Sequence, residues 1–144
     1  MKVEEILRAK GKKVLTVQPN APIILVIRRL KMEDIGAMVV SQDGEHVLGM
    51  ISERDVVRAL VDRGASVLDL RVGHLMSRSA ATCGLQDKVQ DVMAQMTRRR
   101  VRHLPVVDQG RLCGILSIGD AVKSRLDELQ LEANVLRDAY IACR

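Results

Sequence analysis

The sequence predicts a mixed α/β fold in which one strand-helix-hairpin-helix unit occurs twice. The segment 49–55, Gly-Met-Ile-Ser-Glu-Arg-Asp, returns at 114–120 as Gly-Ile-Leu-Ser-Ile-Gly-Asp, and some fifty surrounding residues align after a shift of about 66 positions. The apolar positions 23, 26, 27 and 30 have amphipathic helix spacing, and their counterparts at 89–96 keep it. A duplication of this kind implies two similar half-sites, so function should be sought at their junction.

The chain is expected to form one integrated module with an additional helix at each end. Val3–Lys10 has one apolar face and is followed by Gly11, a residue that favours helix termination. We therefore expect an N-terminal helix within residues 1–12. The first repeat is expected over 13–63, a connector over 64–78, the second repeat over 79–127, and a helical extension over 128–144.

Within each repeat, the pattern predicts a strand, a helix, a hairpin and a second helix. The turn dipeptides Asp43-Gly44 and Gln109-Gly110 mark the two hairpins. Pro22 suits an early helical position, where its missing N–H is no loss. The expected elements are strands near 14–17 and 80–83, helices after Asn20 and Gln86, and hairpins of 37–41 with 47–52 and of 103–107 with 112–117.

Ser52 and Ser117 stand where the last strand of each repeat gives way to a helix. Serine is a favoured helix N-cap, and Asp55 and Asp120 then fall in the first turn, where the helix dipole favours a negative charge. A purely structural capping role therefore competes with any ligand role for this motif. The final helix should run from about Ile118 towards Tyr140. Its apolar stripe (Val122, Leu126, Leu129, Ala133 and Leu136) could either contact another molecule or pack back on its own module.

Composition limits the classes of function. The chain has 144 residues, of which 47% are hydrophobic and 28% charged, and it carries a net charge of +5. Its apolar stretches are too short to span a membrane, and acidic residues stand where a signal peptide would become apolar. The three cysteines lack metal-ligand or redox spacing, so we expect Cys83 and Cys113 to be small buried residues in a cytoplasmic protein. With no Phe, no Trp and one Tyr, the chain cannot stack bases as single-strand nucleic-acid modules do.

Much of the positive charge lies in residues 98–103, Arg-Arg-Arg-Val-Arg-His. The aligned stretch of the first repeat, 32–37, has no basic residue. We interpret Arg98 as part of a solvated charged face, whereas Arg102 and His103 directly precede an apolar strand. The two halves should therefore form unequal sites, with Arg54 as a compensating charge in the first repeat.

These motifs together resemble the CBS domain, and two in tandem resemble a CBS pair, or Bateman module. The resemblance rests on Thr-Val-x-Pro at 16–19, on Arg-His-Leu-Pro-Val-Val-Asp at 102–108, and on the twin Gly-x-x-Ser-x-x-Asp motif; it covers about residues 13–127. Residues 51–58 look most similar to small stand-alone bacterial members. The resemblance implies two β-α-β-β-α repeats packed sheet to sheet with pseudo-twofold symmetry. It also implies two clefts that bind adenine nucleotides or S-adenosylmethionine, and dimerisation of the pairs.

The resemblance also assigns roles to individual residues. It implies that Asp55 and Asp120 hold ribose hydroxyls and that Ser52 and Ser117 face phosphate, consistent with the anion site at a helix N-terminus. Arginine can bind phosphate with two parallel hydrogen bonds. The remaining candidates are Thr16, Thr82 and Gly36 around the base and phosphates, Ala37, Met38, Leu104 and Pro105 against adenine, and Arg54, Arg102 and His103 near phosphate.

The leading functional hypothesis is a non-catalytic sensor that binds AMP, ADP, ATP or NAD(H), needs no catalytic cofactor or metal, and signals to an effector protein in trans or through a homodimer. An enzyme is disfavoured because we find no nucleotide-binding Walker loop, dinucleotide fingerprint or metal-ligand cluster. Two alternatives remain: a protein-interaction scaffold without nucleotide, and a nucleic-acid-associated regulator. The latter is suggested by a pI near 9.4 but disfavoured by the lack of aromatic residues.

Overall fold

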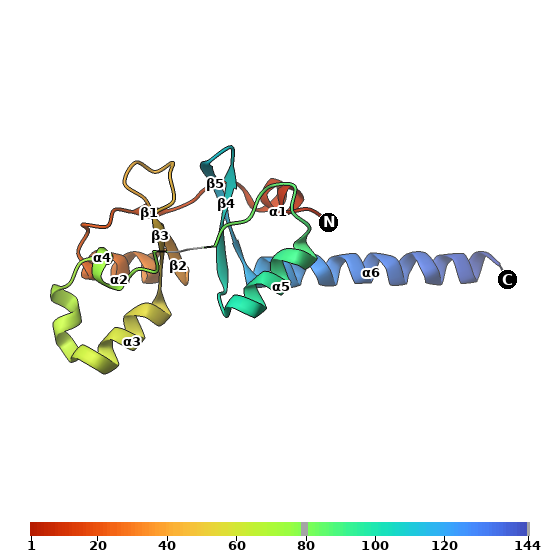
Figure 1. Ribbon diagram of the computed structural model, residues 1–144. Helices are drawn as coiled ribbons and strands as arrows, with labels where there is room; N and C mark the ends of the chain where they lie inside the picture. The colour runs from red at the N-terminus through yellow and green to blue at the C-terminus, as the bar shows by residue number, and fades with distance from the viewer. Residues whose placement is uncertain (79–80, 144) are drawn as a thin grey trace.

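Two small β-sheets face each other at the centre of the molecule, and helices cover their outer sides (Figure 1). The computed structural model describes residues 1–78 and 81–143. In the first sheet, a parallel pair joins an antiparallel hairpin in the order β1-β2-β3; the second sheet is the antiparallel hairpin β4-β5. The strands are β1 (Thr16–Val17), β2 (Ala37–Val40), β3 (Gly49–Ser52), β4 (His103–Asp108) and β5 (Arg111–Ser117).

The helices confirm the duplicated order of elements. The expected N-terminal helix and the long C-terminal helix are both present, and the connector folds as two short helical segments. The helices are α1 (Val3–Lys10), α2 (Ile23–Met32), α3 (Glu53–Arg63), the 3₁₀ segment η1 (Gly64–Asp69), α4 (Val72–Leu75), α5 (Val89–Arg99) and α6 (Ile118–Ala142).

The first strand of the second repeat is shorter than expected. Its expected position includes Ala80, which lies outside the described residues, and Cys83 forms a single parallel bridge with Val106. The Cys83 N–H donates to Pro105 O at 3.0 Å, and the Val107 N–H donates to Cys83 O at 2.8 Å. Val17 pairs with Val40 at the aligned place in the first repeat. In both repeats, the first strand therefore pairs with the second strand at equivalent positions.

Capping boxes start the second helix of both repeats, as the Ser-x-x-Asp spacing predicts. The Ser52 hydroxyl accepts the Asp55 N–H, and the Asp55 carboxylate accepts the Ser52 N–H at 2.8 Å. Ser117 and Asp120 repeat this exchange. Each motif thus satisfies two backbone donors that would otherwise lack a partner.

Each of the two hydrophobic cores includes a helical segment that lies outside its own repeat in the sequence. Val3, Ile6 and Leu7 of α1 precede the first repeat in sequence but pack in the core of the second. The connector packs in the core of the first repeat through Val67 and Val72. Each small sheet is thereby covered by the segment that precedes the other repeat in sequence.

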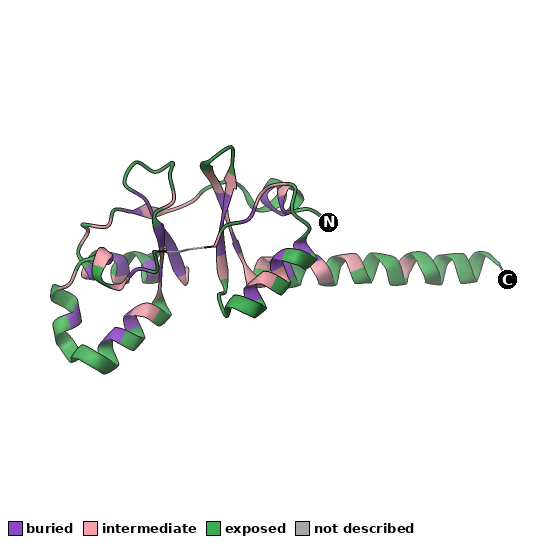
Figure 2. Ribbon diagram, in the orientation of Figure 1, coloured by how far each residue is buried: buried purple, intermediate pink, exposed green. Residues whose placement is uncertain are grey.

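The long helix α6 runs along the second repeat and then projects beyond it, where Figure 2 shows mostly exposed residues. Among the described residues, no helix is long and apolar enough to cross a membrane.

A close contact between α1 and β5 yields the first prediction. A Cβ atom on Gly114 would lie 2.7 Å from Leu7 Cδ1, and Leu7 is only 1% exposed, so Leu7 cannot easily move aside. We expect Gly114→Ala to lower the free energy of unfolding by about 1–3 kcal/mol, the usual cost of overpacking a core. Urea denaturation of the purified variant measures this.

Gly119→Ala is the matched control, because its added Cβ would meet only Ser117 Oγ at 3.6 Å. We expect this variant to keep or slightly raise the stability, since alanine is the better helix former. Equal stability of the Gly114 and Gly119 variants would show that the α1–β5 contact is not tight.

Candidate functional site

Among the clefts that both repeats line, two combine residues of a Ser-x-x-Asp motif from one repeat with the hairpin start of the other: Ser52 and Asp55 in one, and Ser117 without Asp120 in the other. The larger one, which we call cleft A, has a volume of about 590 Å³ and contains the motif of the first repeat. Its lining residues are Gly36, Ala37, Met50, Ser52, Glu53, Arg54, Asp55, Arg58, Ser77, Ala81, Arg99, Arg100, Val101, Arg102, His103 and Leu104.

The smaller cleft, which we call cleft B, has a volume of about 330 Å³ and contains Ser117 of the second motif. Many residues that line cleft B align in sequence with residues that line cleft A; Ile115, for example, aligns with Met50. Gly36, Ala37 and His103 line both clefts and so separate them. The lining of cleft B is completed by Lys10, Lys13, Val14, Leu15, Glu33, Asp34 and Ile35.

The arginines gather in cleft A. Arg102 comes from the second repeat and Arg54 from the first, yet both line this cleft. The expectation that Arg54 compensates for a missing charge in a separate half-site is therefore wrong, because each cleft crosses the repeat boundary. Cleft A is lined by five arginines and two carboxylates, whereas cleft B is lined by two lysines and two carboxylates. This excess of positive charge favours an anionic ligand in cleft A.

Asp55 retains one carboxylate oxygen for a ligand. Its Oδ2 accepts the Ser52 N–H at 2.8 Å and the Ser52 hydroxyl at 3.0 Å. Within residues 1–78 and 81–143, no hydrogen bond to Asp55 Oδ1 is found. Arg54 Nη1 lies 3.3 Å from Arg100 O at the end of α5, which anchors an arginine from one repeat to the other.

Asp120 occupies the aligned position in the second repeat but is already bound by a cation. Lys10 Nζ lies 2.6 Å from Asp120 Oδ2 and 2.9 Å from Ile115 O. Among the described residues Oδ1 of Asp120 accepts no hydrogen bond, like Oδ1 of Asp55, so the two aspartates differ in their charge partner. Burial alone would raise the pKa of the Asp120 carboxyl, but the hydrogen bonds from Lys10 and Ser117 outweigh burial and lower it. The residue that aligns with Lys10 in the second repeat is the buried Met76, so Asp55 has no comparable lysine partner.

His103 stands between the two clefts. Its Cε1 atom would lie 3.2 Å from a Cβ built on Gly36, so a larger residue at position 36 would press on the imidazole. Burial lowers the pKa of His103, and the nearby charge of Lys10 lowers it further, against the opposing effect of Asp120 and Glu53. The imidazole is therefore mainly neutral at pH 7.

The structure brings together most of the candidates from the sequence. Ser52, Arg54, Asp55, Arg102 and His103 all line cleft A, together with Gly36, Ala37 and Leu104. Ser117 lines cleft B. Met38 and Pro105 are buried instead, and Thr16 and Thr82 line neither cleft.

Sequence reasoning missed several residues that line the clefts. Arg99 and Arg100 line cleft A, whereas Arg98 does not. The arginine run could be recognised from the sequence, but the sequence did not show which arginines face the cleft. The left-handed turn at Arg100, which ends α5 with φ 56°, determines this. Lys10 could not be recognised as a site residue from the sequence, because it lies 110 residues from its partner Asp120.

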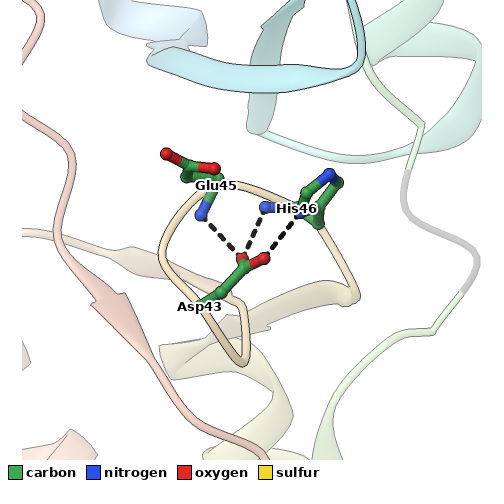
Figure 3. A group of neighbouring side chains, drawn as sticks. All are labelled: Asp43, Glu45 and His46. Atoms are coloured by element: carbon green, nitrogen blue, oxygen red, sulfur yellow. Dashed lines mark hydrogen bonds and ion pairs between the residues drawn. The ribbon is translucent and has the colours of Figure 1, made fainter.

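An exposed acidic turn between β2 and β3 brings Asp43, Glu45 and His46 together (Figure 3). Asp43 Oδ1 accepts the N–H groups of Glu45 and His46, and Oδ2 lies 2.6 Å from His46 Nδ1. These hydrogen bonds, chiefly those from His46, hold the pKa of Asp43 well below its usual range. Since turn geometry accounts for the whole arrangement, we assign no metal to it.

The cysteines differ in accessibility. Cys83 is buried as expected, and burial raises the pKa of its thiol to about 12, which makes it unreactive. Cys113 is only half-buried in β5, and burial again raises its pKa. Cys143 is exposed at the end of α6.

Comparisons with known proteins agree with this architecture. The sequence model of the CBS domain matches residues 3–62 and again residues 72–127. The crystal structure of a CBS-domain containing protein from Agrobacterium tumefaciens is 40% identical with a TM-score of 0.83, over 87% of this chain and 99% of that one. The mitochondrial CBS domain-containing protein CBSX3 of Arabidopsis thaliana is 30% identical, over 96% of this chain and 71% of its own length.

A third similar structure is the CBS domain pair of protein MJ0100, solved in complex with 5′-methylthioadenosine and S-adenosyl-L-methionine. It is 24% identical with a TM-score of 0.76, over 90% of this chain and 98% of that one. At this identity the likeness shows a common fold.

The lowered pKa of His103 predicts a loss of stability in acid. In the unfolded chain its pKa is the ordinary 6.5, so as the pH falls through this value the unfolded state binds a proton that the folded state resists. The free energy of unfolding should therefore fall between pH 7.5 and pH 5.5. Urea denaturation at several pH values, with wild type and His103→Gln side by side, measures the slope.

We expect His103→Gln to show a shallower pH dependence, because glutamine does not titrate. Equal slopes for the two proteins would contradict a half-buried His103 whose neutral form the fold favours.

Proposed function

The chain belongs to the CBS-domain family, and we propose that it is a non-catalytic regulatory module that binds an adenine nucleotide in cleft A. One observation carries this proposal: five arginines line a cleft that also contains a helix start and a carboxylate with one unengaged oxygen. The volume of about 590 Å³ lies within the range of ordinary small-molecule sites.

The arginines would bind the phosphates. Arg102 lies at the entry to β4 and Arg99 and Arg100 at the end of α5, so three arginines from one repeat line the cleft together with Arg54 and Arg58 of α3. Guanidinium groups match phosphate oxygens with paired hydrogen bonds. Ser52 adds a hydroxyl at the N-terminus of α3, where backbone dipoles favour an anion.

The ribose would bind at Asp55. A carboxylate oxygen can accept hydrogen bonds from vicinal ribose hydroxyls, and Asp55 Oδ1 is available while Oδ2 keeps the helix cap. The adenine would lie against apolar side chains (Ala37, Met50, Ala81, Val101 and Leu104), because the described lining residues include no Phe, Tyr or Trp to stack on.

The similar CBS pair with bound 5′-methylthioadenosine and S-adenosyl-L-methionine supports an adenosine-containing ligand. Neither of those two molecules carries a phosphate, and the arginines of cleft A suit a ligand that does. We therefore propose AMP, ADP, ATP or NAD(H), with affinity rising with the number of phosphates.

Signalling would follow from the position of the cleft. Both repeats contribute to cleft A, so a bound nucleotide would favour the relative orientation of the repeats that best encloses it. An effector protein in trans, or a second copy of the chain, would detect this change. We place the module in the cytoplasm, where its three free cysteines would stay reduced.

Two alternatives fit the molecule less well. A nucleic-acid-associated regulator would use the arginine run, but here three of those arginines line a cleft of mononucleotide size. A scaffold without nucleotide would leave five arginines converging on a cleft without a ligand to offset their mutual repulsion.

Replacing a single arginine tests the phosphate site. We expect Arg102→Ala to weaken ATP binding by about tenfold to a hundredfold, corresponding to a loss of about 1.5–3 kcal/mol for a hydrogen bond to a charged group. Isothermal titration calorimetry measures the dissociation constant. Arg98→Ala is the matched control, because Arg98 belongs to the same basic run but does not line the cleft.

Equal weakening by both substitutions would indicate general charge attraction rather than a site. No saturable heat from AMP, ADP, ATP or NADH would refute the nucleotide proposal and leave the fold unchanged.

Replacing the two aligned aspartates tests which cleft holds the ribose. Asp55→Asn should weaken nucleotide binding by about tenfold or more through the lost charged acceptor, while Asp120→Asn should change it by less than about twofold, because Lys10 already binds Asp120. Calorimetry with ADP measures both. The reverse ranking would place the nucleotide at the second Ser-x-x-Asp motif and would contradict the assignment to cleft A.

A further inference from the structure

In the part of the chain that the structure describes, the buried residues of α6 are Ala121 and Ser124, both in its N-terminal half. An ion pair between the N-terminus and Glu128 at 2.9 Å also joins this half to the body. The helix continues to Ala142 and projects away from the body (Figure 1). An isolated helix of about fourteen residues is only marginally stable in water. We therefore expect a contact with another molecule to stabilise the projecting part of α6.

One face of α6 carries apolar residues in a heptad pattern. The spacing between successive members alternates between four and three residues, which is the repeat of a coiled-coil seam. Leu126, Leu129 and Leu136 are 61%, 45% and 72% exposed. We call this face the α6 stripe; it comprises Val122, Leu126, Leu129, Ala133, Leu136, Tyr140 and Cys143.

We propose that the α6 stripe pairs with the α6 stripe of a second copy as a parallel, two-stranded coiled coil. Leu126, Ala133 and Tyr140 would occupy the a positions of the heptad, and Val122, Leu129, Leu136 and Cys143 the d positions. A single stripe that is complementary to itself fits a twofold homodimer.

The flanking charges favour the parallel orientation. In a parallel pair, a g residue faces the e residue of the next heptad on the partner helix, so Glu132 meets Arg137 on both sides of the seam. An antiparallel pair that overlaps the whole stripe would place Glu132 opposite its own copy and Lys123 opposite Arg137. Both of these contacts repel.

Two further exposed apolar residues of α6, Leu131 and Val135, lie on another face. Leu131 and Val135 lie on the same face of α6 as Ser124 and Glu128. Nearer the start of the helix, this face is turned towards the body. Leu131 and Val135 are 65% and 59% exposed, as accessible as the members of the stripe. This pair therefore provides a control that differs from the stripe in position and not in exposure.

Light scattering after gel filtration tests the pairing. We expect wild type to have twice the 16.0 kDa of one chain, and the double variant Leu129→Glu, Leu136→Glu to have the single-chain mass. The control Leu131→Glu, Val135→Glu should remain dimeric, and circular dichroism melting should show that all three proteins fold.

The proposal would be overturned by a monomeric wild type at micromolar concentrations. It would equally be overturned by a stripe variant that stays dimeric, or by loss of the dimer in both double variants. Binding of ATP to the same proteins is a separate readout, so failure of the dimer can be told from failure of the nucleotide site.

Cys143 reports the orientation of the helices. It is exposed and falls on a d position, so a parallel pair would place two Cys143 thiols side by side. Diamide, which takes up the two electrons and two protons released, should then join them in one disulfide. We expect a covalent dimer on a non-reducing gel that disappears with Cys143→Ser, and its absence from wild type would refute the parallel arrangement.

Discussion

The packing of α1 against β5 is the constraint on which the difference between the two clefts depends, because α1 ends in Lys10. A two-stranded hairpin such as β4-β5 is marginal by itself and needs a covering helix. Helix α1 provides that cover, and it approaches β5 closely because position 114 has no side chain. Once α1 is seated there, its last residue, Lys10, reaches Asp120. The same packing that completes the second core therefore pairs the aspartate of the second Ser-x-x-Asp motif with a lysine.

Cleft A keeps its binding groups because no such lysine reaches it. Both Ser-x-x-Asp motifs cap a helix, and this structural role uses Oδ2 of each aspartate. Oδ1 of each aspartate accepts no hydrogen bond among the described residues, but only Asp55 lacks a lysine partner and shares its cleft with the arginines of the second repeat. One aspartate side chain can thus cap a helix and still bind a ligand. The surrounding charges determine which of the two Ser-x-x-Asp motifs can do both.

Most of the elements could be predicted from sequence because they depend on local interactions. The helix of Val3–Lys10, both capping boxes and the two hairpins follow from apolar spacing, turn dipeptides and the Ser-x-x-Asp pattern. Ser52, Asp55, Arg102 and His103 were recognisable as site candidates for the same reason, since each lies within a short motif. Met38 and Pro105 carried the same motif signal but line neither cleft, because their side chains alternate along β2 and β4 with those of Ala37 and Leu104, which line cleft A.

The duplicated fold, the helix caps and the excess of positive charge in one repeat can be read from the amino-acid sequence, because these are properties of neighbouring residues. The three-dimensional packing was needed to show that Arg102 lies with Asp55 rather than with Asp120, that Lys10 binds Asp120, and that the end of α6 lies beyond the body. These pairings join residues that are far apart in the chain. They depend on how the two repeats exchange their covering helices, and that exchange is set by the burial of apolar surface in three dimensions.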